Sequence, residues 1–241
     1  MTIKTTDLPP KLSISLFFFS AILFSVTGKE ISLETPLRVG IYQNRPKIFT
    51  NNKGDPDGIF IDILKDIAFK ENLKLEYVTG NWSDLINQLA QGEIDILPDM
   101  AYTPKRDSLF NFNQLSVINT WLEVYTTPSN RIHSLSEMQH MRIGVLKDSY
   151  QEELLNNKIR TDFNLTYEVV PYEDYKSTKY SLKNRDVDLI VADRFFYFSS
   201  EFDSTIAPTG IVFQPNELYF GFSNHIPLEV LNIYDGSITN L

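Results

Sequence analysis

The 241-residue sequence contains no cysteine, which excludes disulfide bonds, thiolate metal ligands and a cysteine nucleophile. It has only three histidines, His133, His140 and His225, and no two of them stand four residues apart. This spacing does not favour a zinc site, and we expect neither a metal nor a cofactor. Basic residues are in the minority, with 22 lysines and arginines against 31 aspartates and glutamates. Nucleic acid is therefore not an expected partner, and the expected ligand is a small molecule.

Long apolar runs are missing after residue 26. Lys4 and Lys11 precede the uncharged stretch 12–26 (LSISLFFFSAILFSV), and Thr27 and Gly28 follow it. A basic start, a short apolar stretch and a small-residue exit are typical of a secretory signal peptide, whereas a membrane-spanning helix needs about 20 apolar residues. We therefore expect a signal peptide at residues 1–28 and a periplasmic or extracellular protein. The alternative is an uncleaved membrane anchor.

Two parts of the chain alternate strand and helix patterns. In the first part, β-rich runs at 37–42, 75–78 and 94–97 are separated by helical patterns at 59–73 and 82–91. In the second part, runs at 142–146, 167–170 and 187–192 enclose helical patterns at 149–155 and near 172–183. Because parallel neighbours need crossover helices, each part predicts a mainly parallel sheet flanked by helices.

Two extended segments, 121–126 (WLEVYT) and 218–222 (LYFGF), follow these two parts of the chain. We expect them to be hinge strands that join two α/β lobes. Lobe 1 is then formed by residues 37–125 plus 217–241, and lobe 2 by residues 126–216. A hinged pair of lobes places the ligand in the cleft between them, at the carboxyl ends of the sheet strands.

Four stretches together resemble the family 3 bacterial extracellular solute-binding proteins: GIFIDILKDIA (58–68), GEIDILPDMAYTPKRDSLFNF (92–112), RIGVLKDSYQEELL (142–155) and DVDLIVADRFF (186–196). The resemblance covers residues 37–241 and implies a two-lobed periplasmic-binding-protein fold. It implies a protein, not an enzyme, that closes on a small polar or amino-acid-like ligand. The implied partner is an ABC transporter permease or a membrane sensor. Phe60 replaces an acidic residue that is usual in the family, and the YTPKR and ADRFF segments are more similar to its sensor-domain branch.

The resemblance also implies site residues. Arg106 stands where the family's arginine binds a ligand carboxylate, to which a guanidinium offers a matching pair of donors. Asp193 stands where an aspartate holds an α-ammonium group. The alternatives are a surface Arg106 that pairs with Asp107 or Asp99, and an Asp193 that pairs with Arg194.

Other candidates lie near strand ends and helix starts. Thr103 either donates to the same carboxylate or caps the turn before Pro104. Ser149 and Tyr150 stand at a helix start, which attracts anions, although ordinary N-capping explains Ser149 equally well. Trp82 is either an aromatic shelf for the ligand or a core residue.

Tyr42 and Asn44 follow the first strand and are expected at the mouth of the cleft. Asp99 and Ala101 occupy positions where amino-acid binders of the family commonly carry serines. A carboxylate at position 99 would pair with Arg106 or favour a cationic ligand, and an alanine at position 101 removes a donor.

Two other functions remain possible at this point. One is the extracellular sensor domain of a histidine kinase or diguanylate cyclase, in which case we expect the chain to be truncated at Leu241. The other is a periplasmic dehydratase or lyase on the same scaffold, with Asp99 as a general acid. No paired nucleophile and base supports the enzyme.

Overall fold

The structure, a computed structural model, describes residues 35–197 and 205–239. The expected signal peptide at residues 1–28 lies outside this range. Within it, we find no helix with both the length and the apolar character that crossing a membrane requires.

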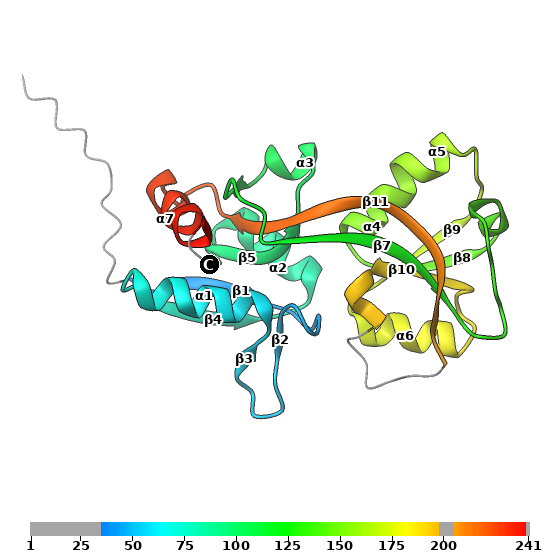
Figure 1. The fold of residues 1–241 in the computed structure, drawn as a ribbon, viewed down its shortest axis with the longest axis horizontal. Helices are drawn as coiled ribbons and strands as arrows, with labels where there is room; N and C mark the ends of the chain where they lie inside the picture. The colour runs from blue at the N-terminus through cyan, green and yellow to red at the C-terminus, as the bar shows by residue number, and fades with distance from the viewer. Residues whose placement is uncertain (1–34, 198–204, 240–241) are drawn as a thin grey trace, which may run out of the picture. The chain divides into compact units, whose positions relative to one another are not determined.

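One large mixed sheet dominates the described part of the chain (Figure 1). Its strands are β1 Leu37–Ile41, β4 Leu75–Thr79, β5 Ile96–Ala101, β6 Asn111–Phe112, β7 Ile118–Thr126, β8 Arg142–Leu146, β9 Glu168–Tyr172, β10 Leu189–Asp193 and β11 Ala207–Phe222. Their order is β4-β1-β5-β11-β7-β10-β8-β9, and β6 pairs with β11 beside this path. The short strands β2 Phe49–Thr50 and β3 Pro56–Asp57 form a separate hairpin.

Helices flank this sheet. They are α1 Ile59–Lys70, α2 Trp82–Gln91, α3 Pro104–Asp107, α4 Tyr150–Leu154, α5 Arg160–Asp162, α6 Tyr175–Lys183 and α7 Leu228–Thr239, with 3₁₀ turns at Leu135–Met138 and Arg194–Tyr197. A π-helical turn, Leu155–Ile159, joins α4 to α5. The helix that the sequence predicts to end at Leu155 therefore continues to Asp162.

Both predicted α/β units are present. β1 lies between β4 and β5 and is parallel to both, and β8 lies in the same way between β9 and β10. Helix α2 packs against β5, and helices α4 and α6 pack against β8. We call the unit of β4, β1 and β5 lobe 1 and the unit of β10, β8 and β9 lobe 2. The chain thus has the two-lobed α/β fold that its sequence predicts.

The two lobes repeat one ion pair at the starts of their strands. Arg38 in β1 donates its backbone N–H and its guanidinium to Asp95, just before β5. Arg142 in β8 donates in the same way to Asp188, just before β10. Each arginine ties the amino ends of two parallel strands together, which leaves the carboxyl ends to form a site.

β7 and β11 lie side by side and connect the lobes (Figure 1). They pair antiparallel from Ala207↔Thr126 to Leu218↔Ile118, with two shifts in register. β7 also pairs with β10, and β11 with β5. The second hinge strand is much longer than the predicted 218–222, because β7 offers an edge along most of its length. The sequence does not predict the first part of β11, because this part contains Pro208, Gly210 and Pro215, which ordinarily interrupt strands.

β5 also extends beyond its predicted end at Leu97, through Ala101. The extension forms because β11 pairs with it, at Leu218↔Ala101 and Tyr219↔Met100. Asp99 adopts a positive φ of 64° there, close to a register shift in the β5–β11 ladder. The predicted helix at 82–91 has these bounds in the structure, and Gly92 ends it in a left-handed conformation with a φ of 72°.

The cores lie between the sheet and its helices. Lobe 1 buries side chains of β1, β5, α1, α2 and α7, and lobe 2 buries side chains of β8, β10 and α4. Representative members of the first are Val39, Phe60, Leu85, Leu97 and Tyr234, and of the second Val145, Leu154, Leu155, Leu189 and Val191.

Candidate ligand-binding site

Two adjoining cavities lie where the carboxyl ends of strands from both lobes meet. The inner cavity has a volume of about 30 Å³ and the outer one about 690 Å³. Four residues line both: Tyr42, Trp82, Leu146 and Tyr175. Most predicted site residues line the inner cavity, namely Tyr42, Trp82, Asp99, Arg106, Ser149, Tyr150 and Asp193. Asn44 and Thr103 are buried beside it instead.

Lys47 is the central residue that the sequence analysis missed. Its ammonium lies 2.7 Å from Asp99 Oδ1 in lobe 1 and 2.5 Å from Asp193 Oδ2 in lobe 2. The Lys47 side chain is only 2% exposed. Burial lowers the pKa of Lys47, but the two carboxylates outweigh burial, and the pKa is raised above its ordinary value. The buried ammonium is therefore charged and joins the two lobes.

Asp99 receives three hydrogen bonds from lobe 1. Besides Lys47, the hydroxyl of Tyr42 donates to Oδ2 at 2.5 Å and the amide of Asn44 donates to it at 2.8 Å. Burial raises the pKa of Asp99, and Lys47 opposes that shift. The alternative of a pair between Asp99 and Arg106 is wrong, because Lys47 binds the carboxylate of Asp99 instead.

Asp193 ends β10 and is held by its own lobe as well as by Lys47. Its Oδ1 accepts from the backbone N–H of Phe195 at 2.8 Å. The alternative of a pair with Arg194 is wrong, because the guanidinium of Arg194 instead lies 4.5 Å from the ring centroid of Trp121.

Arg106 is buried, with 6% of its surface exposed. Its guanidinium donates to the carbonyls of Ala101 at 3.0 Å and Asp148 at 3.2 Å, and it lies 5.5 Å from the ring centroid of Trp82. Burial lowers the pKa of Arg106, but an arginine pKa starts so high that the group remains charged. Within the described residues Arg106 forms no ion pair, so the alternative of a pair with Asp107 is also wrong.

Thr103 and Ser149 both serve as helix caps. Thr103 Oγ1 accepts from the backbone N–H of Arg106 at 3.2 Å, which fixes the start of α3. Ser149 Oγ accepts from the N–H of Glu152 at 3.3 Å and donates to the carbonyl of Leu146. Ser149 still lines the inner cavity, next to Tyr150. Thr103 acts on the site through the position of Arg106.

Trp82 belongs to the core and to the cavity wall at the same time. It is 3% exposed, and its ring centroid lies 5.0 Å from that of Tyr42. Its indole N–H donates to the carbonyl of Asp148 at 3.1 Å. The next residue, Ser83, donates its hydroxyl to the carboxylate of Asp148. The start of α2 in lobe 1 thus holds the loop before α4 in lobe 2.

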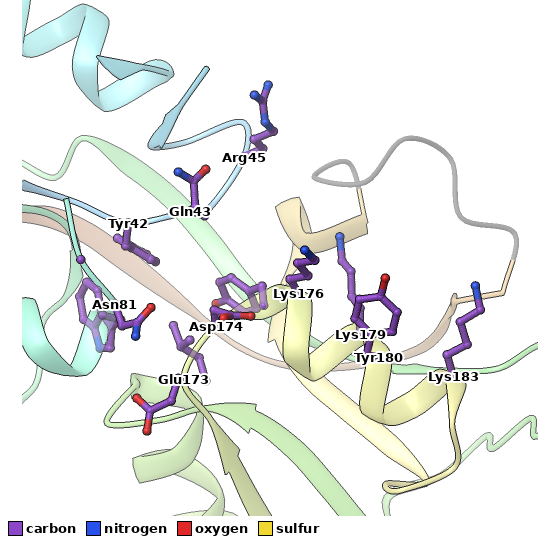
Figure 2. A pocket seen from close by; sticks show the side chains of 14 residues that line it. Tyr42, Gln43, Arg45, Asn81, Glu173, Asp174, Lys176, Lys179, Tyr180 and Lys183 are labelled. Carbon is purple, nitrogen blue, oxygen red and sulfur yellow. The ribbon is translucent and has the colours of Figure 1, made fainter. Parts of the chain in front are cut away.

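The outer cavity has a strongly basic wall. Figure 2 shows Lys176, Lys179, Tyr180 and Lys183 extending from α6, and Arg45 extending from lobe 1. Two acidic residues also line it, but Glu173 pairs with Lys147 at 2.7 Å and Asp174 caps α6. Among the described residues that line the outer cavity, basic side chains therefore outnumber acidic ones, in a chain whose net charge is −9.

Nothing in the described part of the chain groups three or more histidine, aspartate or glutamate side chains in a way that could hold a metal ion. His225 forms hydrogen bonds to Asp95 at 2.9 Å and to Ser223 at 2.8 Å, away from both cavities.

Residues 37–156 match the family model described as bacterial extracellular solute-binding proteins, family 3. This part of the chain belongs to that family. Members of this family are mainly binding proteins that act outside the cytoplasm. The two-lobed fold of this chain is the fold of such proteins.

Several relatives and solved structures are similar to this chain, at low sequence identity. A probable histidine-binding protein of Campylobacter jejuni is 23% identical over 172 residues, which are 69% of this chain and 63% of that relative. The chain therefore matches less than two thirds of this relative's length. A putative L-cystine ABC transporter structure from Listeria monocytogenes has a TM-score of 0.77 at 21% identity, over 86% of this chain and 89% of that one. A histidine kinase sensor domain has a TM-score of 0.76 at 15% identity, over 86% and 90%. Both structures therefore share the fold of this chain.

Proposed function

We propose that the chain is a periplasmic solute-binding protein that closes on a small polar molecule bearing a carboxylate. In this proposal residues 37–125 plus 217–241 form lobe 1, residues 126–216 form lobe 2, and the ligand binds where the lobes meet. Arg106 binds the carboxylate, Trp82 and Tyr42 flank the ligand, and Ser149 and Tyr150 contact it from lobe 2.

One observation carries the proposal: a buried arginine lines the inner cavity and has no carboxylate partner among the described residues. Burying a charge without an ionic partner is unfavourable. Carbonyl acceptors at Ala101 and Asp148 orient the guanidinium but do not neutralise it. A ligand carboxylate would neutralise it through the paired hydrogen bonds that a guanidinium favours.

The inner cavity is too small for an amino-acid-sized ligand, since about 30 Å³ corresponds to roughly one water molecule. Binding therefore requires the lobes to separate and close again, or the ligand to extend into the outer cavity of about 690 Å³. Hinged closure is a common response of two-lobed binding proteins.

Thermal shift and isothermal titration with amino acids, 2-oxo acids, 2-hydroxy acids and dicarboxylates test the proposal. We expect at least one carboxylate to bind, and Arg106→Ala to weaken it by about 100-fold or more, because a charge-assisted bidentate pair is lost. Arg131→Ala, at an exposed arginine, is the matched control and should bind like the wild type. If Arg106→Ala bound the ligand as tightly as the wild type, Arg106 would not be part of the binding site.

Delivery to an ABC transporter permease and signalling through a membrane sensor are both compatible with this site. The likeness to a histidine kinase sensor domain supports signalling as the second candidate. Pull-down with the permease components encoded nearest to the gene, against pull-down with the adjacent sensor proteins, would separate the two.

A further inference from the structure

Of the residues that the structure describes, four with charged side chains line the inner cavity: Lys47, Asp99, Arg106 and Asp193. They do not form two equivalent pairs. Lys47 contacts both carboxylates, and Arg106 contacts neither. The cavity thus already supplies a cation to its acidic residues. Among the described residues, its second cation has two carbonyl acceptors and the ring of Trp82 as partners, but no carboxylate.

The two carboxylates are well supplied with donors from the protein itself. Asp99 accepts from Lys47, Tyr42 and Asn44, and Asp193 accepts from Lys47 and from the backbone of Phe195. An ammonium group on a ligand would have to displace Lys47 or share these oxygens with it. Displacement would leave the buried Lys47 ammonium without its carboxylate partners. Sharing would place two cations side by side at low dielectric, and both arrangements are unfavourable.

The backbone around Lys47 keeps this ammonium in place. The N–H of Lys47 donates to the carbonyl of Asn44 at 2.9 Å, and its own carbonyl accepts from the N–H of Phe60 at the start of α1 at 3.0 Å. Ile48 and Phe49, which follow, are buried in lobe 1. Lys47 is therefore anchored in the core of lobe 1 at both sides, and only its side chain reaches Asp193 of lobe 2.

We infer that Lys47 replaces the ammonium group of an amino-acid ligand, so that the ligand is a carboxylate without an α-ammonium group, such as a 2-oxo or 2-hydroxy acid. This inference rests on the proposed function and specifies its ligand class. Arg106 takes the carboxylate, and Lys47 provides the positive charge that the acidic residues require.

The outer cavity supports an anionic ligand independently. Arg45, Lys176 and Lys183 line it, and the two acidic residues that line it in the described part of the chain are engaged with Lys147 and with the start of α6. A positive wall raises the local concentration of anions and speeds their association. It gives no comparable advantage to a neutral zwitterion.

Matched pairs of ligands test the inference. Each common L-amino acid is compared with its 2-oxo and 2-hydroxy analogue by isothermal titration to the wild-type protein. We expect the best-bound acid to bind at least about tenfold more tightly than the amino acid of the same side chain. Tighter binding of the amino acid would overturn the inference.

A variant pair reports on Lys47 directly. Lys47→Met combined with Asp99→Asn removes one charge of each sign, which keeps the local charge balance and leaves Asp193 open to a ligand ammonium. We expect this double variant to reverse the preference, with the amino acid now bound more tightly than its 2-oxo analogue. An unchanged preference in a folded double variant would show that Lys47 is only a structural bridge and would overturn the inference.

These outcomes separate the inference from the proposed function. Amino-acid binding by the wild type that Arg106→Ala abolishes sustains the function and overturns the ligand class. If none of the probes binds to the wild type, both the function and the ligand class are contradicted.

Discussion

Lys47 and Asp193 are 146 residues apart in the sequence, and their side chains meet at 2.5 Å between the two lobes. The same ammonium contacts Asp99, so one lysine joins carboxylates from both lobes. The three residues of this bridge line the inner cavity together with Arg106. The bridge therefore bears on the stability of the fold as well as on ligand binding.

Loss of the Lys47 ammonium should destabilise the fold. Lys47→Met leaves two carboxylates buried without their cation, and we expect a loss of about 3–5 kcal/mol in the free energy of unfolding. Urea denaturation followed by circular dichroism measures it. The double variant with Asp99→Asn should recover a large part of that loss, because one of the two uncompensated charges is gone. Lys53→Met, in the exposed turn after β2, is the control and should change little.

Gly58 is expected to be intolerant of a side chain. It has a φ of +114°, and a Cβ there would lie 2.6 Å from the carbonyl oxygen of Lys47. Gly58→Ala should therefore cost about 3 kcal/mol or more, from backbone strain together with the clash. Gly54→Ala is a matched control, because Gly54 also has a positive φ of +88° but has nothing within 4 Å of an added Cβ. It should cost only about 1 kcal/mol. Equal losses in the two variants would show that contact with Lys47 is unimportant.

The repeated arginine–aspartate pairs should make stability depend on pH. Burial raises the pKa of Asp95, but hydrogen bonds from Arg38 and His225 outweigh it, so the pKa lies below its ordinary value of 3.8. A lowered carboxyl pKa gives stability that is present above pH 3.8 and is lost as the pH falls through the folded-state pKa. Asp95→Asn should therefore cost about 1–2 kcal/mol at pH 7, and this difference from the wild type should shrink below pH 4.

Asp188 in lobe 2 makes the corresponding pair with Arg142, and its pKa is also lowered against the effect of burial. Both partners are more exposed than those of lobe 1. Asp188→Asn should therefore cost less than Asp95→Asn in urea denaturation at pH 7. A larger loss at Asp188 would contradict the view that exposure weakens the second pair.

The two tryptophans should report binding differently. Trp82 lines both cavities, whereas Trp121 lies in β7 beside Arg194 and lines neither. Titration of the best-bound acid should change the fluorescence of Trp121→Phe as it does in the wild type. In Trp82→Phe the change should be lost. A signal that persists without Trp82 would place the ligand away from this wall.

The parallel units were predictable because strand and helix patterns alternate clearly in the sequence, and Arg142–Leu146 and Trp82–Gln91 form as predicted. The length of β11 was not predictable, because the strand forms by pairing with β7 and contains residues that ordinarily break strands. The register of β5 beyond Leu97 depends on β11 in the same way.

The positions of Arg106 and Asp193 at the inner cavity were predictable because family resemblance and strand ends coincide there, while their role in binding stays a prediction. Lys47 was missed because it lies between a strand and a turn, in a segment with no periodic pattern. The one local signal is a lysine within the apolar stretch PKIF (46–49), a few residues after the strand β1 ends at Ile41. Its two partners are distant in the sequence, so only the folded chain identifies them.

A crystal structure of the wild-type protein with its best-bound carboxylate tests the central claim most directly. We predict that the ligand carboxylate lies about 3 Å from the guanidinium of Arg106, and that the Lys47 ammonium still bridges Asp99 and Asp193. A carboxylate bound away from Arg106 would contradict the account.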